Sequence, residues 1–121
     1  MELLSHNAEH VTVRFSLEEL EIIRFVLADA HRMDKFIRGV SLEEVEDLKT
    51  IISAAKQSDL QITQRQWGNI LGVLNACCAA PSPREERRIE EIKQVLEKTS
   101  DLVKIANKSV QSLIERLAND S

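Results

Sequence analysis

Histidine and cysteine are the side chains that could bind a metal or supply a nucleophile, and the chain has few of them. His6 and His10 are four residues apart, but no third ligand follows at a metal-site spacing, so we interpret them as part of a polar terminus. Cys77 and Cys78 are adjacent and lack a CxxC pattern, which is typical of small core residues. The sequence also contains no phosphate-binding glycine loop and no GxSxG motif. We therefore predict no catalytic residue, no cofactor, no metal site and no enzyme activity.

Carboxylates are the remaining chemically active groups, and they gather in two runs at 18–21 and 43–47. Both runs fall in the first turn of an expected helix, where the helix dipole favours anions, so electrostatic capping alone would explain them. Residues 17–59 nevertheless hold ten acidic and six basic residues, a net charge of −4, whereas 60–121 hold eight and nine, a net charge of +1. The acidic first part of the chain suits a basic protein partner and would repel a nucleic-acid backbone. An ordinary solvated surface is the alternative.

One aromatic side chain lies among these acids. Glu21, Phe25 and Asp29 are four residues apart and would share the outer face of one helix. Phe25 is then either an exposed anchor for a partner or a core residue packed under the C-terminal helix. The candidate partner-binding residues are Glu18, Glu21, Phe25, Asp29, Glu43 and Asp47.

Length and composition fit one small domain. The chain has 121 residues, of which 43% are hydrophobic and 30% charged, as in ordinary globular proteins. It has no apolar run near ~20 residues, which a membrane span would need. It also shows no secretion signal, and its two cysteines are not placed to pair, so we expect a cytoplasmic protein.

A helix-opening pattern occurs twice. Ser16 can cap a helix with Glu19 completing a capping box, and Thr63 with Gln66 repeats this 47 residues later. The same offset relates further positions: Val13 with Leu60, Phe15 with Ile62, Ile23 with Ile70, Val26 with Val73, Leu27 with Leu74, and 42–45 with 89–92. A period of this size is typical of duplicated structural units, and a chance repetition of capping residues is the alternative.

The expected architecture is all-α, with two tandem helix-pair units at 11–56 and 58–100 in one helical domain. Short extended segments at 11–15 and 60–62 introduce the units, and residues 1–10 are expected to be flexible. The helices are expected at 17–32, from 41 onward, at 64–79, and from 82 to about 118. Apolar or small residues in the last of these recur every three or four positions from 89 to 117, a heptad stripe. That helix either continues unbroken, which we favour, or breaks near 99–101. A homodimer through this stripe is a further expectation.

The segments EELEIIRFVLADA and FIRGVSLEEVEDL resemble small helical bacterial proteins of immunity-like type, which carry an ELxxLRxAL helix followed by an RxGVSxEE helix start. The resemblance covers residues 18–48 and, in degenerate form, 65–95, where GVS is absent. It implies a protein that neutralises a toxin, often by laying an acidic helical surface over a basic nuclease. We therefore predict a non-enzymatic protein-binding module, most concretely a toxin-neutralising immunity protein.

A competing resemblance is to ribbon-helix-helix repressors, because VTVRFSLEEL is similar to their strand and first helix. A duplicated strand-helix-helix unit would form their two-fold ribbon within one chain, and Thr12, Arg14 and Gln61 would read a DNA groove. Three features count against this alternative: Gly39 falls where the second helix of that fold should be continuous, Asp59 flanks the second strand, and the protein is acidic.

Overall fold

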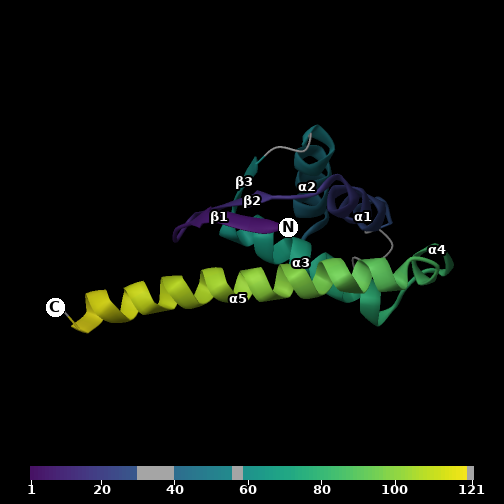
Figure 1. Cartoon of the computed structure of the whole chain (residues 1–121). Coiled ribbons are helices and arrows are strands. Elements are labelled where there is room, and N and C mark those ends of the chain that lie inside the picture. The colour runs from purple at the N-terminus through teal and green to yellow at the C-terminus, as the bar shows by residue number, and fades with distance from the viewer. Residues whose placement is uncertain (30–39, 56–58, 120–121) are drawn as a thin grey trace.

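The computed structural model describes residues 1–29, 40–55 and 59–119, with residues 107–119 described as helix backbone (Figure 1). The expected all-α class is wrong, because three strands form an antiparallel sheet in the order β1-β2-β3. Its elements in chain order are β1 (Glu2–His6), β2 (His10–Arg14), α1 (Leu17–Ala28), α2 (Leu42–Ala54), β3 (Asp59–Thr63), α3 (Gln64–Ala79), α4 (Pro83–Glu86) and α5 (Ile89–Asn119). The fold is therefore mixed, with helices and a sheet, and the prediction of a purely helical domain, a helical bundle, is wrong.

The N-terminal segment that was expected to be flexible contributes the edge strand β1. A tight turn joins it to β2, in which the Asn7 side chain accepts hydrogen bonds from the backbone N–H groups of Glu9 and His10, both at 2.8 Å. Such local side-chain bonds favour a turn. His6 lies opposite Val11 in the resulting hairpin, so His6 and His10 are on different strands and not on one helical face.

Helices α1, α2, α3 and α4 begin where the sequence predicts. The side chains of Ser16, Ser41, Thr63 and Ser82 each accept a hydrogen bond from the backbone of the residue three positions later, and each capping box is closed. These bonds satisfy donors that the first helical turn leaves unpaired. The capping residues therefore determine where α1, α2, α3 and α4 begin.

The 47-residue offset also appears in the structure. Leu17, the first residue of α1, is 47 residues before Gln64, the first of α3, and Leu42 of α2 is 47 before Ile89 of α5. Strands β2 and β3 pair antiparallel with Val13 opposite Leu60, a pair that has the same offset. The units β2-α1-α2 and β3-α3-α5 are therefore related by a pseudo-two-fold axis through this strand pair.

The core lies between the inner face of the sheet and the helices. Val11, Val13 and Ile62 are buried on that face, and Phe15 meets Trp67 edge-on with ring centroids 6.1 Å apart. The buried helical residues of the two units occupy corresponding positions, including Leu20 with Trp67, Ile23 with Ile70, Val26 with Val73, Leu27 with Leu74, Val45 with Ile92 and Leu48 with Val95.

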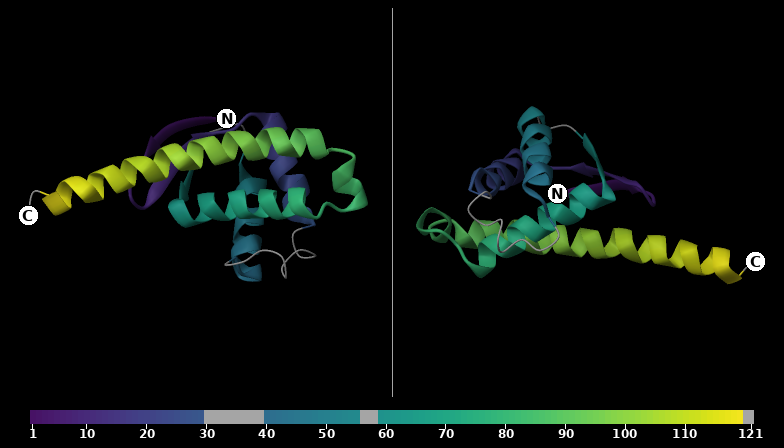
Figure 2. Two further views of the ribbon diagram at one scale, coloured as in Figure 1. Left: turned by 90° about the horizontal axis from the view of Figure 1, so that it is seen from below. Right: turned by 180° about the vertical axis from the view of Figure 1, so that it is seen from behind.

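The C-terminal helix differs from its prediction at one point. A turn at Arg87 and Arg88, where the Arg88 N–H donates to the Glu85 carbonyl at 3.0 Å, separates short α4 from α5. Beyond it α5 is continuous through 99–101, and it lies side by side with α3 (Figure 2). Within the described ranges, no helix combines the length and apolar character needed to cross a membrane.

Candidate functional site

The pseudo-two-fold axis relates two surface clefts. One lies between α2 and α3, and the other lies between the start of α1 and the first turns of α5. All six described residues that line the α2–α3 cleft have counterparts, 47 residues away, among those that line the α1–α5 cleft. The corresponding pairs are Thr63 with Ser16, Arg65 with Glu18, Gln66 with Glu19, Asn69 with Ile22, Glu44 with Glu91, and Asp47 with Gln94. The clefts thus occupy corresponding positions in the two units, and they differ in the residues that line them.

Arg65 and Glu44 form an ion pair inside the α2–α3 cleft. The Arg65 guanidinium donates to both carboxylate oxygens of Glu44, with Nε at 2.7 Å from Oε2 and Nη2 at 3.0 Å from Oε1. Asn69 Nδ2 donates to Glu44 Oε2 at 2.6 Å. These hydrogen bonds, that from Arg65 first, lower the pKa of Glu44 to about 2. This cleft has a volume of about 230 Å³ and its central carboxylate is fully engaged.

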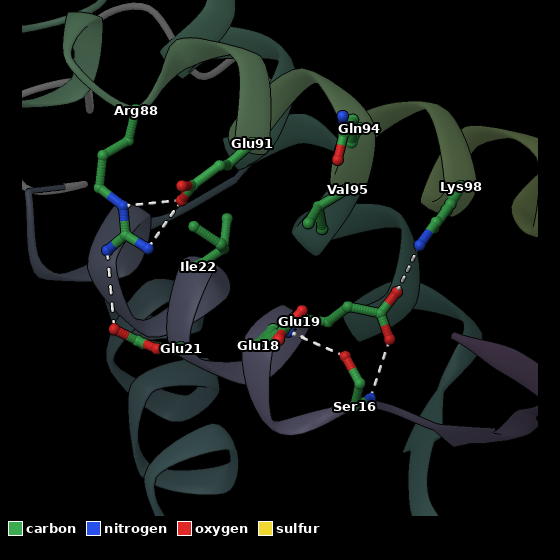
Figure 3. A pocket seen from close by; sticks show the side chains of 10 residues that line it. All are labelled: Ser16, Glu18, Glu19, Glu21, Ile22, Arg88, Glu91, Gln94, Val95 and Lys98. Carbon is green, nitrogen blue, oxygen red and sulfur yellow. Dashed lines mark hydrogen bonds and ion pairs between the residues drawn. The ribbon is translucent and has the colours of Figure 1, made fainter.

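The α1–α5 cleft is larger, about 410 Å³, and more acidic (Figure 3). Glu18 stands at the position of Arg65, so the guanidinium that fills the other cleft is replaced here by a carboxylate. Arg88, in the turn just before α5, instead reaches Glu91 of α5, with its Nε at 2.9 Å from Oε2, and its Nη1 lies 3.7 Å from Glu21 Oε1. Within the described part of the chain, no ion pair engages Glu18.

A buried carboxylate forms the floor of this cleft. Glu19 is 5% exposed, and its Oε1 accepts the Ser16 N–H at 2.8 Å and lies 2.6 Å from the Met1 amino group. Lys98 of α5 reaches its Oε2 at 3.5 Å. Burial raises the pKa of Glu19, but the hydrogen bonds from Met1 and Ser16 outweigh burial and the pKa is lowered. Glu19 thus links the start of α1 to the amino group of Met1, just before β1, and to Lys98 of α5.

The charge of the α1–α5 cleft follows from its lining. Its four glutamates, Glu18, Glu19, Glu21 and Glu91, are accompanied by two cations, Arg88 and Lys98, which leaves a net charge of −2. The α2–α3 cleft has Glu44 and Asp47 against Arg65, a net charge of −1. An open acidic recess of this size can accept the cationic side chain of another molecule, and complementary charge would orient its approach.

Phe25 is neither the exposed anchor nor the core residue that the sequence suggested. Its side chain is half-buried at the edge of the core. The guanidinium carbons of Arg84 and Arg88 lie 5.0 and 5.2 Å from its ring centroid, which is the geometry of cation–π contacts. Because Arg88 also belongs to the α1–α5 cleft, Phe25 holds a cleft residue in place and does not offer its own face to a partner.

The prediction that Asp29 is an exposed partner-binding residue is wrong. Asp29 is 5% exposed, and its Oδ2 has no hydrogen-bond partner among the described residues. The expected helix ran to 32, whereas α1 ends at Ala28 and Asp29 is its C-cap, with its N–H bonded to the carbonyls of Val26 and Leu27. The Asp29 carboxylate is close enough to buried Cys77 of α3 to contribute to the raised pKa of that thiol, so this end of α1 is packed against the rest of the protein. Position 32 lies outside the described residues.

The remaining predicted residues are exposed but divided between two places. Glu18 and Glu21 line the α1–α5 cleft, whereas Glu43 lies on the surface of α2 and Asp47 lines the α2–α3 cleft. The structure adds Arg88, Glu91 and Lys98 to the candidate site, and none of these was predicted. The repeat contained a signal for one of them, because Glu91 is the counterpart of Glu44.

The outer face of the sheet bears on the DNA-binding alternative. Thr12 lies opposite Gln61, and Arg14 lies opposite Asp59 at the end of the ribbon. Arg14 is already paired, with its Nε at 2.9 Å from Asp59 Oδ1 and its Nη1 at 3.6 Å from Glu2 Oε2. The outward side chains therefore do not form a basic stripe.

No protein-family model, curated protein or solved structure matches the chain.

Among the described residues, histidine, cysteine and acidic side chains form no group of three that could hold a metal ion. Cys77 is buried, and burial followed by its hydrogen bond to Glu85, at 3.0 Å, raises the pKa of its thiol. A neutral buried thiol is a poor nucleophile, so the α1–α5 cleft is the stronger candidate site.

Proposed function

We propose that the protein is a non-enzymatic binding module whose α1–α5 cleft receives a basic segment of another protein. The observation that supports this most is the difference between the two equivalent clefts. Arg65 occupies one and neutralises Glu44, whereas Glu18 stands at the corresponding position of the other. A cationic side chain of a partner would enter the α1–α5 cleft beside Glu18, because the chain itself places a carboxylate there and not a cation. Hydrogen bonds between a guanidinium and carboxylates are among the stronger polar contacts in proteins.

In its most concrete form the proposal is a bacterial immunity protein that acts in the cytoplasm. Such a protein binds a toxin domain with a basic surface, and the acidic cleft offers complementary charge. Glu18 and Glu21 are exposed at its rim, and rim charges act mainly on the association rate. Neutralisation then requires only that the bound protein cover the toxin's substrate-binding surface.

The experiment compares two charge reversals on different faces. The paired variant Glu18→Lys and Glu21→Lys alters the α1–α5 cleft, and Glu43→Lys with Glu46→Lys makes the same change of charge on the exposed surface of α2. If the adjoining reading frame encodes a toxin-like domain, each variant is co-expressed with that domain, and host growth and the association rate of the purified proteins are measured.

The proposal expects the cleft variant to lose protection and to associate at least ~10-fold more slowly, while the α2 variant stays close to the wild type. Equal slowing in both variants would point to net charge alone. Unchanged protection by the cleft variant would refute the proposed site.

A DNA-binding regulator is the second candidate, and the pseudo-two-fold β2–β3 ribbon favours it. Two features of the ribbon oppose it. β1 adds a third strand about 4.8 Å beyond β2, whereas the major groove, ~12 Å wide, admits a two-stranded ribbon. The outer face also carries Glu2 and Asp59 around Arg14. Steeply salt-dependent binding to duplex DNA that Arg14→Ala weakens would establish this candidate in place of the first.

A further inference from the structure

The capping residue of α1 carries a charge that its capping role does not need. Glu19 Oε1 accepts the Ser16 N–H at 2.8 Å, and in the second unit Gln66 Oε1 accepts the Thr63 N–H at 2.9 Å in the same way. A neutral amide therefore closes the equivalent capping box, and a carboxylate is not required for it. The negative charge of Glu19 needs a further explanation.

The two carboxylate oxygens of Glu19 have different surroundings. Oε1 accepts the Ser16 N–H and lies 2.6 Å from the amino group of Met1. Oε2 is buried and has no hydrogen bond within the described residues, and Lys98 Nζ lies 3.5 Å from it. A charge-assisted hydrogen bond from nitrogen to a carboxylate is usually about 2.7–2.9 Å long, so Lys98 does not form one. Buried polar atoms nearly always have a hydrogen-bond partner, so Oε2 is an acceptor that another donor could use.

Lys98 is held only weakly in the α1–α5 cleft. Its side chain is 59% exposed, and it points from α5 toward the Glu19 carboxylate (Figure 3). An ion pair of such a lysine contributes little, because solvent screens the charges and the long side chain loses freedom. In the α2–α3 cleft, by contrast, Arg65 donates two hydrogen bonds to Glu44, at 2.7 and 3.0 Å. Ile51 stands 47 positions before Lys98, so the corresponding position of the first unit carries no cation.

We propose that Lys98 is an exchangeable internal cation, and that an arginine side chain of the partner displaces it from Glu19 Oε2. This inference rests on the proposed function, and it names the acceptor inside the cleft and the residue that competes for it. A guanidinium is more weakly hydrated than an ammonium, so it loses less on approaching a buried carboxylate, and it donates from several nitrogens. Lys98 then turns its flexible side chain into solvent. The competition excludes cations that fit Oε2 no better than Lys98 does.

Calorimetric titration with an arginine-rich peptide near physiological salt tests the exchange. Lys98→Met keeps the apolar stem of the side chain and removes the competing ammonium, so it should bind the peptide at least ~5-fold more tightly than the wild type. Lys93→Met is the matched control, because Lys93 is an exposed residue of α5 outside the cleft lining and its replacement changes the net charge equally. Because salt screens charges at a distance, the control should change the affinity by less than ~2-fold.

A further variant separates competition for Glu19 from general charge repulsion. Glu19→Gln keeps an oxygen for the capping box, as Gln66 does in the second unit, and removes the charged acceptor. It should weaken peptide binding by at least ~10-fold. Adding Lys98→Met to Glu19→Gln should then give no further gain, because the acceptor for which the two cations compete is gone. Circular dichroism and Trp67 fluorescence verify that each variant is folded.

The outcomes distinguish this inference from the proposed function. Equal affinities of Lys98→Met and Lys93→Met, or a gain from Lys98→Met that persists beside Glu19→Gln, would overturn the exchange. The proposed function would still stand in that case if Glu18→Lys with Glu21→Lys abolished peptide binding. A peptide that binds none of the proteins, or that binds regardless of the Glu18→Lys and Glu21→Lys pair, would overturn both.

Discussion

Val13 on β2 and Leu60 on β3 lie directly opposite one another, and they are also 47 residues apart in the chain. The pairing is consequently symmetric around them, with Thr12 opposite Gln61 on one side and Arg14 opposite Asp59 on the other. The same offset relates the helix starts and the linings of the two clefts. This pair of residues therefore marks the pseudo-two-fold axis from which the comparison of the clefts follows.

Residues on the inner face of the β2–β3 strand pair should contribute more to the free energy of unfolding than residues on its outer face. Val13 is 0% exposed, so Val13→Ala removes buried methyl groups and is expected to lower the free energy of unfolding by about 2 kcal/mol. Thr12→Ala on the outer face should cost less than ~1 kcal/mol. Urea denaturation followed by Trp67 fluorescence gives both values, and similar losses would contradict the assignment of the two faces.

The ion pair in the α2–α3 cleft should make the free energy of unfolding depend on pH in the acidic range. The pKa of Glu44 is lowered from 4.5 to about 2, so its ionised form stabilises the folded state above pH 4.5 and this contribution disappears as pH falls through about 2. Glu44→Gln should be less stable than the wild type at neutral pH. The difference should shrink between pH 4.5 and pH 2.

Glu43→Gln is the control for this experiment, because it removes the same charge from the adjacent, exposed position of α2. Urea denaturation at several pH values compares the three proteins. A gap between Glu44→Gln and the wild type that persists at pH 2 would show that the carboxylate charge is not what Arg65 and Asn69 stabilise.

Phe25 should have an intermediate effect on stability. Its ring is half-buried beneath Arg84 and Arg88, so Phe25→Ala is expected to cost about 2 kcal/mol, less than the ~3–5 kcal/mol of a fully buried phenylalanine. Phe25→Leu retains apolar contact but loses the aromatic face, and it should recover part of the loss. Thermal denaturation of both variants tests this. A loss below ~0.5 kcal/mol for Phe25→Ala would instead indicate an exposed side chain.

Gly68 offers a stabilising substitution. It lies within α3, and a methyl group added there would meet nothing within 4 Å among the described residues. Because glycine costs about 1 kcal/mol relative to alanine inside a helix, Gly68→Ala should raise the free energy of unfolding by up to ~1 kcal/mol. At Gly72 the added methyl would meet Val40 Cγ2 at 3.7 Å, an ordinary contact, so Gly72→Ala should also be tolerated. Destabilisation by Gly68→Ala would reveal a close neighbour at that face.

Local sequence signals predicted the helix starts well. A capping box involves residues three positions apart, so Ser16, Ser41, Thr63 and Ser82 could be recognised without tertiary information. The strand β1 could not be recognised in this way. Only part of its apolar content faces the core, and its pairing with β2 depends on a turn built by the Asn7 side chain. The all-α prediction failed at this point.

The candidate site could be predicted only in part. Glu18 and Glu21 were found because an acidic run at a helix start is visible in the sequence. Arg88 was missed because its contacts with Glu21 and Phe25 join residues more than sixty positions apart, and no local pattern reports them. Asp29 was misassigned because its burial depends on how the end of α1 packs near Cys77 of α3, which the four-residue spacing of Glu21, Phe25 and Asp29 does not report.

The most direct test of the proposed binding site is an amide NMR titration of the ¹⁵N-labelled protein with an arginine-rich peptide. If the peptide binds in the α1–α5 cleft, the amide chemical-shift changes should concentrate at Glu18, Glu21 and Glu91. The paired variant Glu18→Lys and Glu21→Lys should abolish these changes. The acidic surface of α2 around Glu43 and Asp47 serves as an internal control, since a nonspecific cation would perturb it equally. Shifts that are spread evenly over both acidic surfaces, or that survive the paired substitution, would contradict a specific site in the cleft.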